Sequence, residues 1–311
     1  MSNYPQIPDP AYAKGVSAPF CGVLDGDLVV AGGANFPDKP LLEGGSKKVY
    51  DDVWRLRHDA WECIAHLEDS TAYGATFQLP GALVFAGGTG LDKVYLLDAE
   101  GLRSLPPLPE LVSEAGASVS GESLWLAGAG KVFTCKAGEW QWEVFCEMPV
   151  PLVQPLMFAT PDALYLWAGF NPETLDVPCC GWKLCLSSVE AGWQQIPGAP
   201  DGGTFVGAAG VATPDGRFAV VGGVNREVFA RALRNTPEDR IPYLSKQPAE
   251  YRFRKTVYVF DPSTEIWSEL LSADACALAG PGLACDGRHL IVAGGEIKPG
   301  VRSSRIFSID L

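Results

Sequence analysis

The sequence predicts an all-β protein, folded as a six-bladed β-propeller. A short apolar run that ends in small residues, usually Gly-Gly, occurs six times along the chain. Its copies are LVVAGG (28–33), LVFAGG (83–88), LWLAGA (124–129), LYLWAG (164–169), FAVVGG (218–223) and LIVAGG (290–295). A turn containing Gly or Pro precedes every copy, and the 35 Gly and 25 Pro residues are spread along the chain as turn residues would be. Such regular repetition is typical of a propeller, in which every blade uses the same pattern.

Each repeat accounts for the four strands of one blade. A small-residue strand precedes the turn, as in YGATFQL, and the apolar run is the second strand. A third strand with an aromatic residue follows, as in VYDDVWRL (49–56), and several repeats add an outer strand with Trp, as in WECIAHL (61–67). Gly-Gly ends the second strand where neighbouring backbones crowd and a side chain would clash. The alternative, a pair of β-sandwiches with chance Gly-Gly pairs, is disfavoured because six copies recur in register.

The two ends of the sequence predict how the ring closes. The sixth repeat stops at Leu311 after its third strand, so its outer strand is missing. Residues 4–11 (YPQIPDPA) parallel the outer-strand segment 193–200 (WQQIPGAP). We therefore expect the N-terminal strand to complete the last blade, which closes the ring non-covalently and removes an exposed sheet edge. Residues 1–311 then form a single domain.

Charge and composition exclude several functions. The chain has 24 Lys and Arg against 37 Asp and Glu, a formal net charge of −13, whereas nucleic acids and anionic membranes attract basic surfaces. No run of about 18 apolar residues predicts a membrane span. The N-terminus lacks the basic and apolar regions of a secretory signal, and the nine Cys form no disulfide framework. We expect a cytoplasmic protein, or a periplasmic one if a signal has been removed; the sequence does not indicate its oligomeric state.

The loops that follow the second strands differ greatly in length. All of them emerge on one face of a propeller, and those of repeats 1, 5 and 6 are long, at 34–48, 224–256 and 296–304. These three repeats become neighbours once the ring closes, so the functional site is expected there. Residues 225–257 hold eight basic and four acidic residues. This loop therefore predicts a positive mouth for an anionic ligand, although a solvated loop surface is the alternative.

At this point a family resemblance becomes visible. The segments GGVNREVF (222–229), YRFRKTVYVFDPSTEIW (251–267) and GGEIKPGVR (294–302) resemble the bacterial N-acetylneuraminate epimerases, which are kelch-type sialic acid mutarotases. The segment GGANFPDKPLLEGGSKKVYDDVW (32–54) resembles a loop that comes late in those proteins, so the blade order is similar to that of a cyclically permuted subfamily. The resemblance implies a kelch propeller that interconverts the α and β anomers of an anionic sugar, N-acetylneuraminate or a relative, without a metal or other cofactor.

The resemblance also implies site residues. Glu296 is the expected proton acceptor. Arg302, six residues later across a Lys-Pro-Gly turn, is expected to bind the sugar carboxylate. If it lies near Glu296, it is also expected to favour the ionised form of that carboxylate. The alternative for this pair is an ion pair that only staples the loop. Asn225 and Asn35 follow Gly-Gly pairs and are expected either to bind the sugar or to be left-handed turn residues. The remaining substrate-binding candidates are Arg226, which stands where an amide is usual, and two weaker ones at the rim, Lys255 and Arg254. For these two, a role in the fold of the loop is the favoured alternative.

Other chemistries lack support in the sequence. AGAGK (127–131) departs from the phosphate-loop pattern, and the three His (58, 66 and 289) lack metal-ligand spacing with Cys179, Cys180 and Cys185. We therefore expect no metal site. Two functions from other classes stay open, namely a non-catalytic carbohydrate-binding propeller and a kelch module that binds other proteins.

Overall fold

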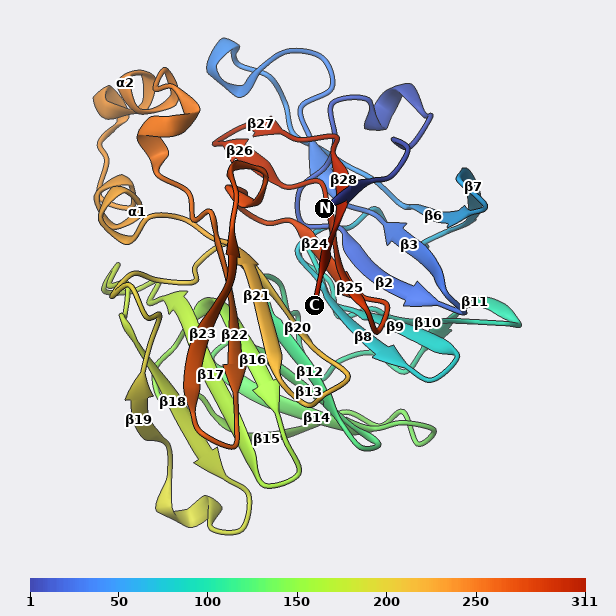
Figure 1. Cartoon of the computed structure of the whole chain (residues 1–311), viewed down its shortest axis with the longest axis vertical. Coiled ribbons are helices and arrows are strands. Elements are labelled where there is room, and N and C mark those ends of the chain that lie inside the picture. Colours follow the sequence, from blue (N-terminus) through green and yellow to red (C-terminus); the bar gives the residue numbers. More distant parts are fainter.

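Six four-stranded antiparallel sheets form a ring in the computed structural model, which describes all 311 residues except for the side chain of Ala168 (Figure 1). The innermost strand of each sheet contacts the innermost strands of the two neighbouring sheets, and the last sheet contacts the first in the same way. The ring is therefore complete, and the predicted six-bladed propeller is confirmed.

The first three blades are continuous in sequence. Blade 1 contains β2 (Phe20–Leu24), β3 (Asp27–Ala31), β6 (Asp52–Arg57) and β7 (Ala60–His66). Blade 2 contains β8 (Ala75–Leu79), β9 (Ala82–Ala86), β10 (Val94–Asp98) and β11 (Gly101–Leu105). Blade 3 contains β12 (Gly116–Ser120), β13 (Ser123–Gly128), β14 (Lys131–Lys136) and β15 (Glu143–Glu147).

The other three blades follow, and the last one draws a strand from each end of the chain. Blade 4 contains β16 (Val153–Ala159), β17 (Ala163–Phe170), β18 (Cys180–Cys185) and β19 (Gln194–Pro197). Blade 5 contains β20 (Ala208–Ala212), β21 (Phe218–Gly222), β22 (Thr256–Asp261) and β23 (Ile266–Ser272). Blade 6 contains β24 (Gly282–Cys285), β25 (His289–Ala293), β28 (Ile306–Asp310) and β1 (Ser2–Asn3).

The remaining elements decorate the long loops of blades 1, 5 and 6. In the loop of blade 1, β4 (Ala34–Asn35) pairs with β5 (Lys48–Val49). In the loop of blade 6, β26 (Glu296–Lys298) pairs with β27 (Val301–Arg302). The α-helices are α1 (Arg226–Ala232) and α2 (Arg240–Leu244). Short 3₁₀ turns cover Pro10–Tyr12, Leu41–Glu43, Val189–Ala191, Pro237–Asp239, Pro248–Tyr251 and Asp274–Cys276. Figure 1 shows the three long loops gathered at the top of the view.

The N-terminal strand completes blade 6, as the sequence predicts, but with other residues than expected. β1 pairs with β28, and the Tyr4 N–H continues this pairing with a 2.9 Å bond to the Ile306 carbonyl. The expected segment 4–11 leaves the sheet after Tyr4. It contains three prolines, and proline has no N–H for a sheet ladder. The pairing strand therefore lies nearer the terminus than the sequence comparison placed it.

The apolar core lies between the blades. At each of the six joints, alternate residues of the second and third strands of one blade pack against those of the next blade. Val30 faces blade 6 and Val29 faces blade 2, and both are at most 1% exposed. Each blade is thus buried on both faces, which explains why the second strands are continuous apolar runs instead of alternating ones.

The Gly-Gly pairs attach the four blades that contain them to the segments that enter the next blades. A Cβ on Gly294 would lie 2.2 Å from the Val16 carbonyl oxygen, and the Gly295 N–H donates to that same oxygen at 2.8 Å. The equivalent pair in blade 1, Gly32 and Gly33, meets the Thr71 carbonyl in the same manner. All four glycines also have positive φ. The predicted backbone crowding is confirmed, and its partner is the neighbouring blade.

Two further observations concern the chain as a whole. Among the described residues, no helix combines the length and the apolar composition needed to cross a membrane. The nine cysteines are free thiols in this structure.

Candidate active site

A cavity of about 360 Å³ opens on the axis of the propeller, on the face that carries the long loops. Its walls are the first residues of the innermost strands of all six blades. Its roof comes from the loop of blade 5, which contributes Tyr243, Tyr251 and Phe253. The hairpin of blade 6 extends the wall on its own side and contributes Glu296. The volume falls within the range of about 300–1,000 Å³ that is usual for small-molecule sites.

A ring of left-handed residues surrounds this cavity. One residue with positive φ stands at the entry to each innermost strand, namely Ala18, Tyr73, Glu114, Gln154, Gly207 and Gly280. Five of their backbone N–H groups donate to the carbonyl of the equivalent residue in the adjacent blade, at 2.6–3.0 Å. All six residues line the cavity. The fold therefore presents six equivalent positions around one opening, and three of them carry large polar side chains.

Glu296 reaches the cavity from the β26–β27 hairpin. Its N–H donates to the Ala279 carbonyl at 2.7 Å, and its carbonyl accepts from the Ala279 N–H at 2.9 Å. The Pro-Gly turn returns the chain so that Arg302 is the strand partner of Glu296. Lys298 holds the hairpin from outside, because its ammonium donates to the Leu244 and Lys246 carbonyls at 3.2 and 2.9 Å.

Arg302 is buried behind Glu296. Its guanidinium pairs with the Glu296 carboxylate, donates through Nε to the Ala34 carbonyl at 3.0 Å, and stacks 5.3 Å from the centre of the Phe36 ring. The side chain of Arg302 is 2% exposed, whereas that of Glu296 is 22% exposed. This position suits a partner that favours the ionised carboxylate. It gives no support to the expectation that Arg302 binds a sugar carboxylate, since the guanidinium is enclosed by protein.

Three other polar residues line the cavity, from blades 2, 3 and 4. Tyr73, Glu114 and Gln154 occupy left-handed positions of the ring, and the Tyr73 hydroxyl accepts a 3.1 Å hydrogen bond from the ammonium of Lys47. None of these three residues, nor Lys47, was predicted from the sequence. A signal existed, because at the entry to the first strand three repeats have Ala or Gly where these three have Tyr, Glu and Gln.

Both carboxyl groups of the cavity have raised pKa values. Burial raises the pKa of Glu296, although the charges of Arg302 and Lys47 act in the opposite direction. Burial also raises the pKa of Glu114, against a hydrogen bond with Gln154 and the charge of Lys47, which lower it. The site therefore holds two carboxyl groups with shifted pKa values and one exposed ammonium whose charge acts on both.

The two predicted asparagines have different positions. Asn225 lines the cavity, and its side chain also caps α1 by accepting from the Val228 N–H at 3.1 Å. Asn35 is fully buried outside the cavity, where its amide donates to the Ala11 and Gly15 carbonyls. Neither residue has positive φ, so the left-handed alternative is wrong for both.

The three predicted binding residues Arg226, Arg254 and Lys255 serve the fold. Arg254 is buried and bonds Asp201 and the Thr204 carbonyl, while Lys255 pairs with Asp274 at 2.6 Å. Arg226 donates to the Val177 carbonyl at 2.8 Å. Among the described side chains, no arginine or lysine of 225–257 lines the cavity. The predicted positive mouth is therefore wrong for this loop, because its aromatic residues line the cavity and its basic residues do not.

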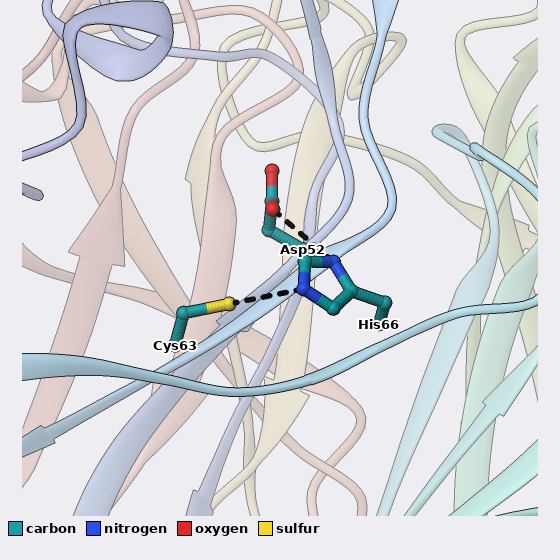
Figure 2. A group of neighbouring side chains, drawn as sticks. All are labelled: Asp52, Cys63 and His66. Atoms are coloured by element: carbon teal, nitrogen blue, oxygen red, sulfur yellow. Dashed lines mark hydrogen bonds and ion pairs between the residues drawn. The ribbon is translucent and has the colours of Figure 1, made fainter.

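Asp52, Cys63 and His66 form a separate cluster on blade 1, and a β-bulge in β7 brings the last two to one side (Figure 2). The His66 ring lies between its partners, with Nδ1 3.3 Å from the Asp52 carboxylate and Nε2 3.9 Å from the Cys63 sulfur. One metal ion binds only one nitrogen of a histidine ring. We therefore interpret the cluster as a chain of polar contacts in which each ring nitrogen of His66 has its own partner, and not as a metal site.

These features define a class: a six-bladed propeller with a carboxylate and a buried arginine at an axial cavity. A family model described as N-acetylneuraminate epimerase matches residues 105–311, about two thirds of the chain. The chain therefore belongs to the N-acetylneuraminate epimerase family.

Curated relatives support this assignment, and a solved structure supports the fold. The chain is 24% identical over 233 residues to an N-acetylneuraminate epimerase of Haemophilus influenzae strain PittEE, covering 70% of this chain and 61% of that protein. It is 22% identical over 221 residues to one of Salmonella enteritidis, covering 66% and 57%. The chain thus spans about 60% of the length of these relatives. The solved structure of YjhT is similar in fold, with a TM-score of 0.59, 22% identity, and coverage of 66% of this chain and 65% of that one.

The match leaves residues 1–104 outside the family model. This region contains segment 32–54, which resembles a late loop of the family. A cyclic permutation of the blades explains both observations, and it stays a prediction.

Proposed function

We propose that this protein is an isomerase that accelerates interconversion of the α and β anomers of N-acetylneuraminate or a related sialic acid. The observation that carries the proposal is Glu296, a carboxylate on the wall of an axial cavity, paired with the buried Arg302. The family to which the chain belongs, and the names of its relatives, support the same activity.

The proposed reaction opens the cyclic hemiketal and closes it again on the other face. Opening requires a base that takes the proton of the anomeric hydroxyl. Glu296 suits this role for two reasons. Its raised pKa makes it a stronger base than an ordinary glutamate, and the guanidinium of Arg302 favours the ionised form that a base must have.

The surroundings of Glu296 fit an anionic sugar. We assign the sugar carboxylate to the neighbourhood of Lys47, the ammonium whose charge acts on both cavity carboxyls. The aromatic residues of the roof offer apolar surface to the C–H face of the ring. Asn225 is the remaining predicted binding residue that lines the cavity. This arrangement replaces the expected contribution of the blade 5 arginines.

NMR saturation exchange between the anomers of N-acetylneuraminate tests the proposal. We expect the wild type to accelerate exchange and Glu296→Gln to lower the acceleration at least about 100-fold, the usual contribution of a general base. Glu122→Gln, which changes an exposed glutamate in the β12–β13 turn, is the matched control. If the wild type gives no acceleration, the proposal is wrong. Retained binding of the sugar would then favour the non-catalytic carbohydrate-binding alternative.

A further inference from the structure

Anomer interconversion requires proton transfer at two oxygen atoms, and Glu296 serves one of them. We propose that Glu114 is the second proton-transfer residue and acts at the ring oxygen of the sugar. This inference rests on the proposed function, because it assigns a catalytic role within that reaction.

The topology places Glu114 across the cavity from Glu296. Glu114 stands at the entry to blade 3, and Glu296 belongs to the hairpin of blade 6. Three steps around a ring of six blades lead to the opposite side of the axis. Both residues line the same cavity, so a sugar bound on the axis lies between them. The anomeric hydroxyl and the ring oxygen are attached to one carbon, and two groups on opposite walls can reach them from different directions.

The backbone at Glu114 is held in a conformation that glutamate rarely adopts. Its φ is +54°, which is the left-handed region that favours glycine. Two hydrogen bonds fix it, from the Glu114 N–H to the Tyr73 carbonyl at 2.6 Å and from the Gln154 N–H to the Glu114 carbonyl at 3.0 Å. The equivalent positions in blades 5 and 6 are glycines. A glutamate in this place costs conformational free energy, and such strain is typical of residues that a site requires.

Burial raises the pKa of Glu114, although two of the groups that face its carboxyl lower it. Gln154 hydrogen-bonds its carboxyl, the charge of Lys47 acts on it, and the Tyr73 hydroxyl is occupied by the Lys47 ammonium. Glu296 and its partner Arg302 belong to the other side of the cavity. Burial raises the pKa of Glu114, which favours the protonated form of its carboxyl. Among the described residues that line the cavity, Glu114 and Glu296 are the acidic ones.

The two carboxyl groups together complete the reaction. Glu296 takes the proton of the anomeric hydroxyl while the bond between the anomeric carbon and the ring oxygen breaks. The electron pair of that bond goes to the ring oxygen, which takes the proton of Glu114. In the open-chain keto form, rotation about the bond that joins the carbonyl carbon to the rest of the sugar chain turns the other face of the carbonyl toward the hydroxyl that closes the ring. Closure on the other face reverses both transfers, so that Glu114 recovers its proton and Glu296 its charge.

Exchange of N-acetylneuraminate anomers, measured as kcat and KM, tests the proposal on the full chain. Glu114→Gln keeps the shape of the side chain but removes the exchangeable acid, and we expect kcat to fall at least about 100-fold with KM changed less than about threefold. Glu114→Gly separates chemistry from folding. Glycine adopts φ of +54° without strain, so the melting temperature should not fall, while kcat should fall as in Glu114→Gln.

The outcomes distinguish this inference from the function on which it rests. Loss of kcat in both Glu114 variants, with Glu122→Gln unchanged, supports it. Wild-type kcat in Glu114→Gln, combined with an inactive Glu296→Gln, overturns it and leaves the proposed function intact. A raised KM with unchanged kcat also overturns it, because Glu114 would then bind the sugar without transferring a proton. Absence of acceleration by the wild type overturns both.

Discussion

The two sides of the axial cavity are built by different means. Blades 5, 6 and 1 have long loops after their second strands, and they present Glu296 on a hairpin supported by a buried ion pair. Blades 2 and 3 have short connections there, and the side chains of Tyr73 and Glu114 come directly from left-handed residues at the strand entries. Gln154 of blade 4 is also a left-handed residue at a strand entry.

This difference shows where each side obtains its rigidity. A long loop needs side-chain contacts to fix its position, and the hairpin of Glu296 has them in Arg302 and Lys298. A strand entry is already fixed by the ring of backbone hydrogen bonds, so a residue there needs no supporting side chain. Substitutions should therefore be costly for stability on the first side and mild on the second.

The largest effect is expected for Arg302→Met. The substitution leaves Glu296 buried without its cation, which typically costs about 3–5 kcal/mol of unfolding free energy, and it should also abolish activity. Urea unfolding measures the stability. Arg217→Met is the control, because its pair with Asp215 is at the surface, with side chains 39% and 53% exposed, and such pairs contribute less than about 1 kcal/mol. Equal losses in the two variants would contradict the proposed importance of burial.

A somewhat smaller effect is expected for Gly294→Ala, at the base of the same hairpin. The new methyl group would lie 2.2 Å from the Val16 carbonyl oxygen, and φ is +68°. Strain and displacement together should cost about 3 kcal/mol. Gly121→Ala has a similar φ of +60° but open space around the methyl group, and it should cost about 1 kcal/mol. Thermal unfolding of both variants measures the difference, and a cost for Gly294→Ala no larger than that of the control would rule out the contact.

The smallest effect is expected for Gln154→Gly on the other side. Its φ is +60°, and glycine removes the strain of that conformation, so stability should change by less than about 1 kcal/mol, in the direction of a gain. Chemical denaturation is a sufficient measurement. A loss above about 2 kcal/mol would mean that the side chain supports the ring, and the contrast between the two sides would then fail.

The propeller could be predicted because its signal is repeated. Six apolar runs with their turns defined the blades, and the missing outer strand of the last blade defined the closure. The position of β1 could not be predicted as well, because segment 4–11 shares Gln-Ile-Pro with the outer-strand segment 193–200, and this likeness drew the strand away from Ser2–Asn3.

The site could be predicted only in part. Glu296 and Arg302 are six residues apart in one hairpin, so local sequence brings them together. Glu114 is brought to the same cavity by the closure of the ring, and no local sequence pattern predicts that it lies near Glu296. The basic residues of 225–257 misled the prediction for a related reason. The net charge of a loop does not show which groups its side chains bind. Arg254 binds residues of segment 201–204, and Arg226 binds the Val177 carbonyl, so both partners come from other parts of the chain.

The closure of blade 6 also sets the order in which the protein becomes complete during synthesis. β1 precedes every other blade strand, and its partner β28 follows them all. Throughout translation of residues 4–305, β1 therefore has no partner, and the last joint of the core stays open to water. The wall that carries Glu296 is also among the last parts to emerge. A nascent chain thus holds five blades without a closed cavity, so that folding of the scaffold and assembly of the site finish together.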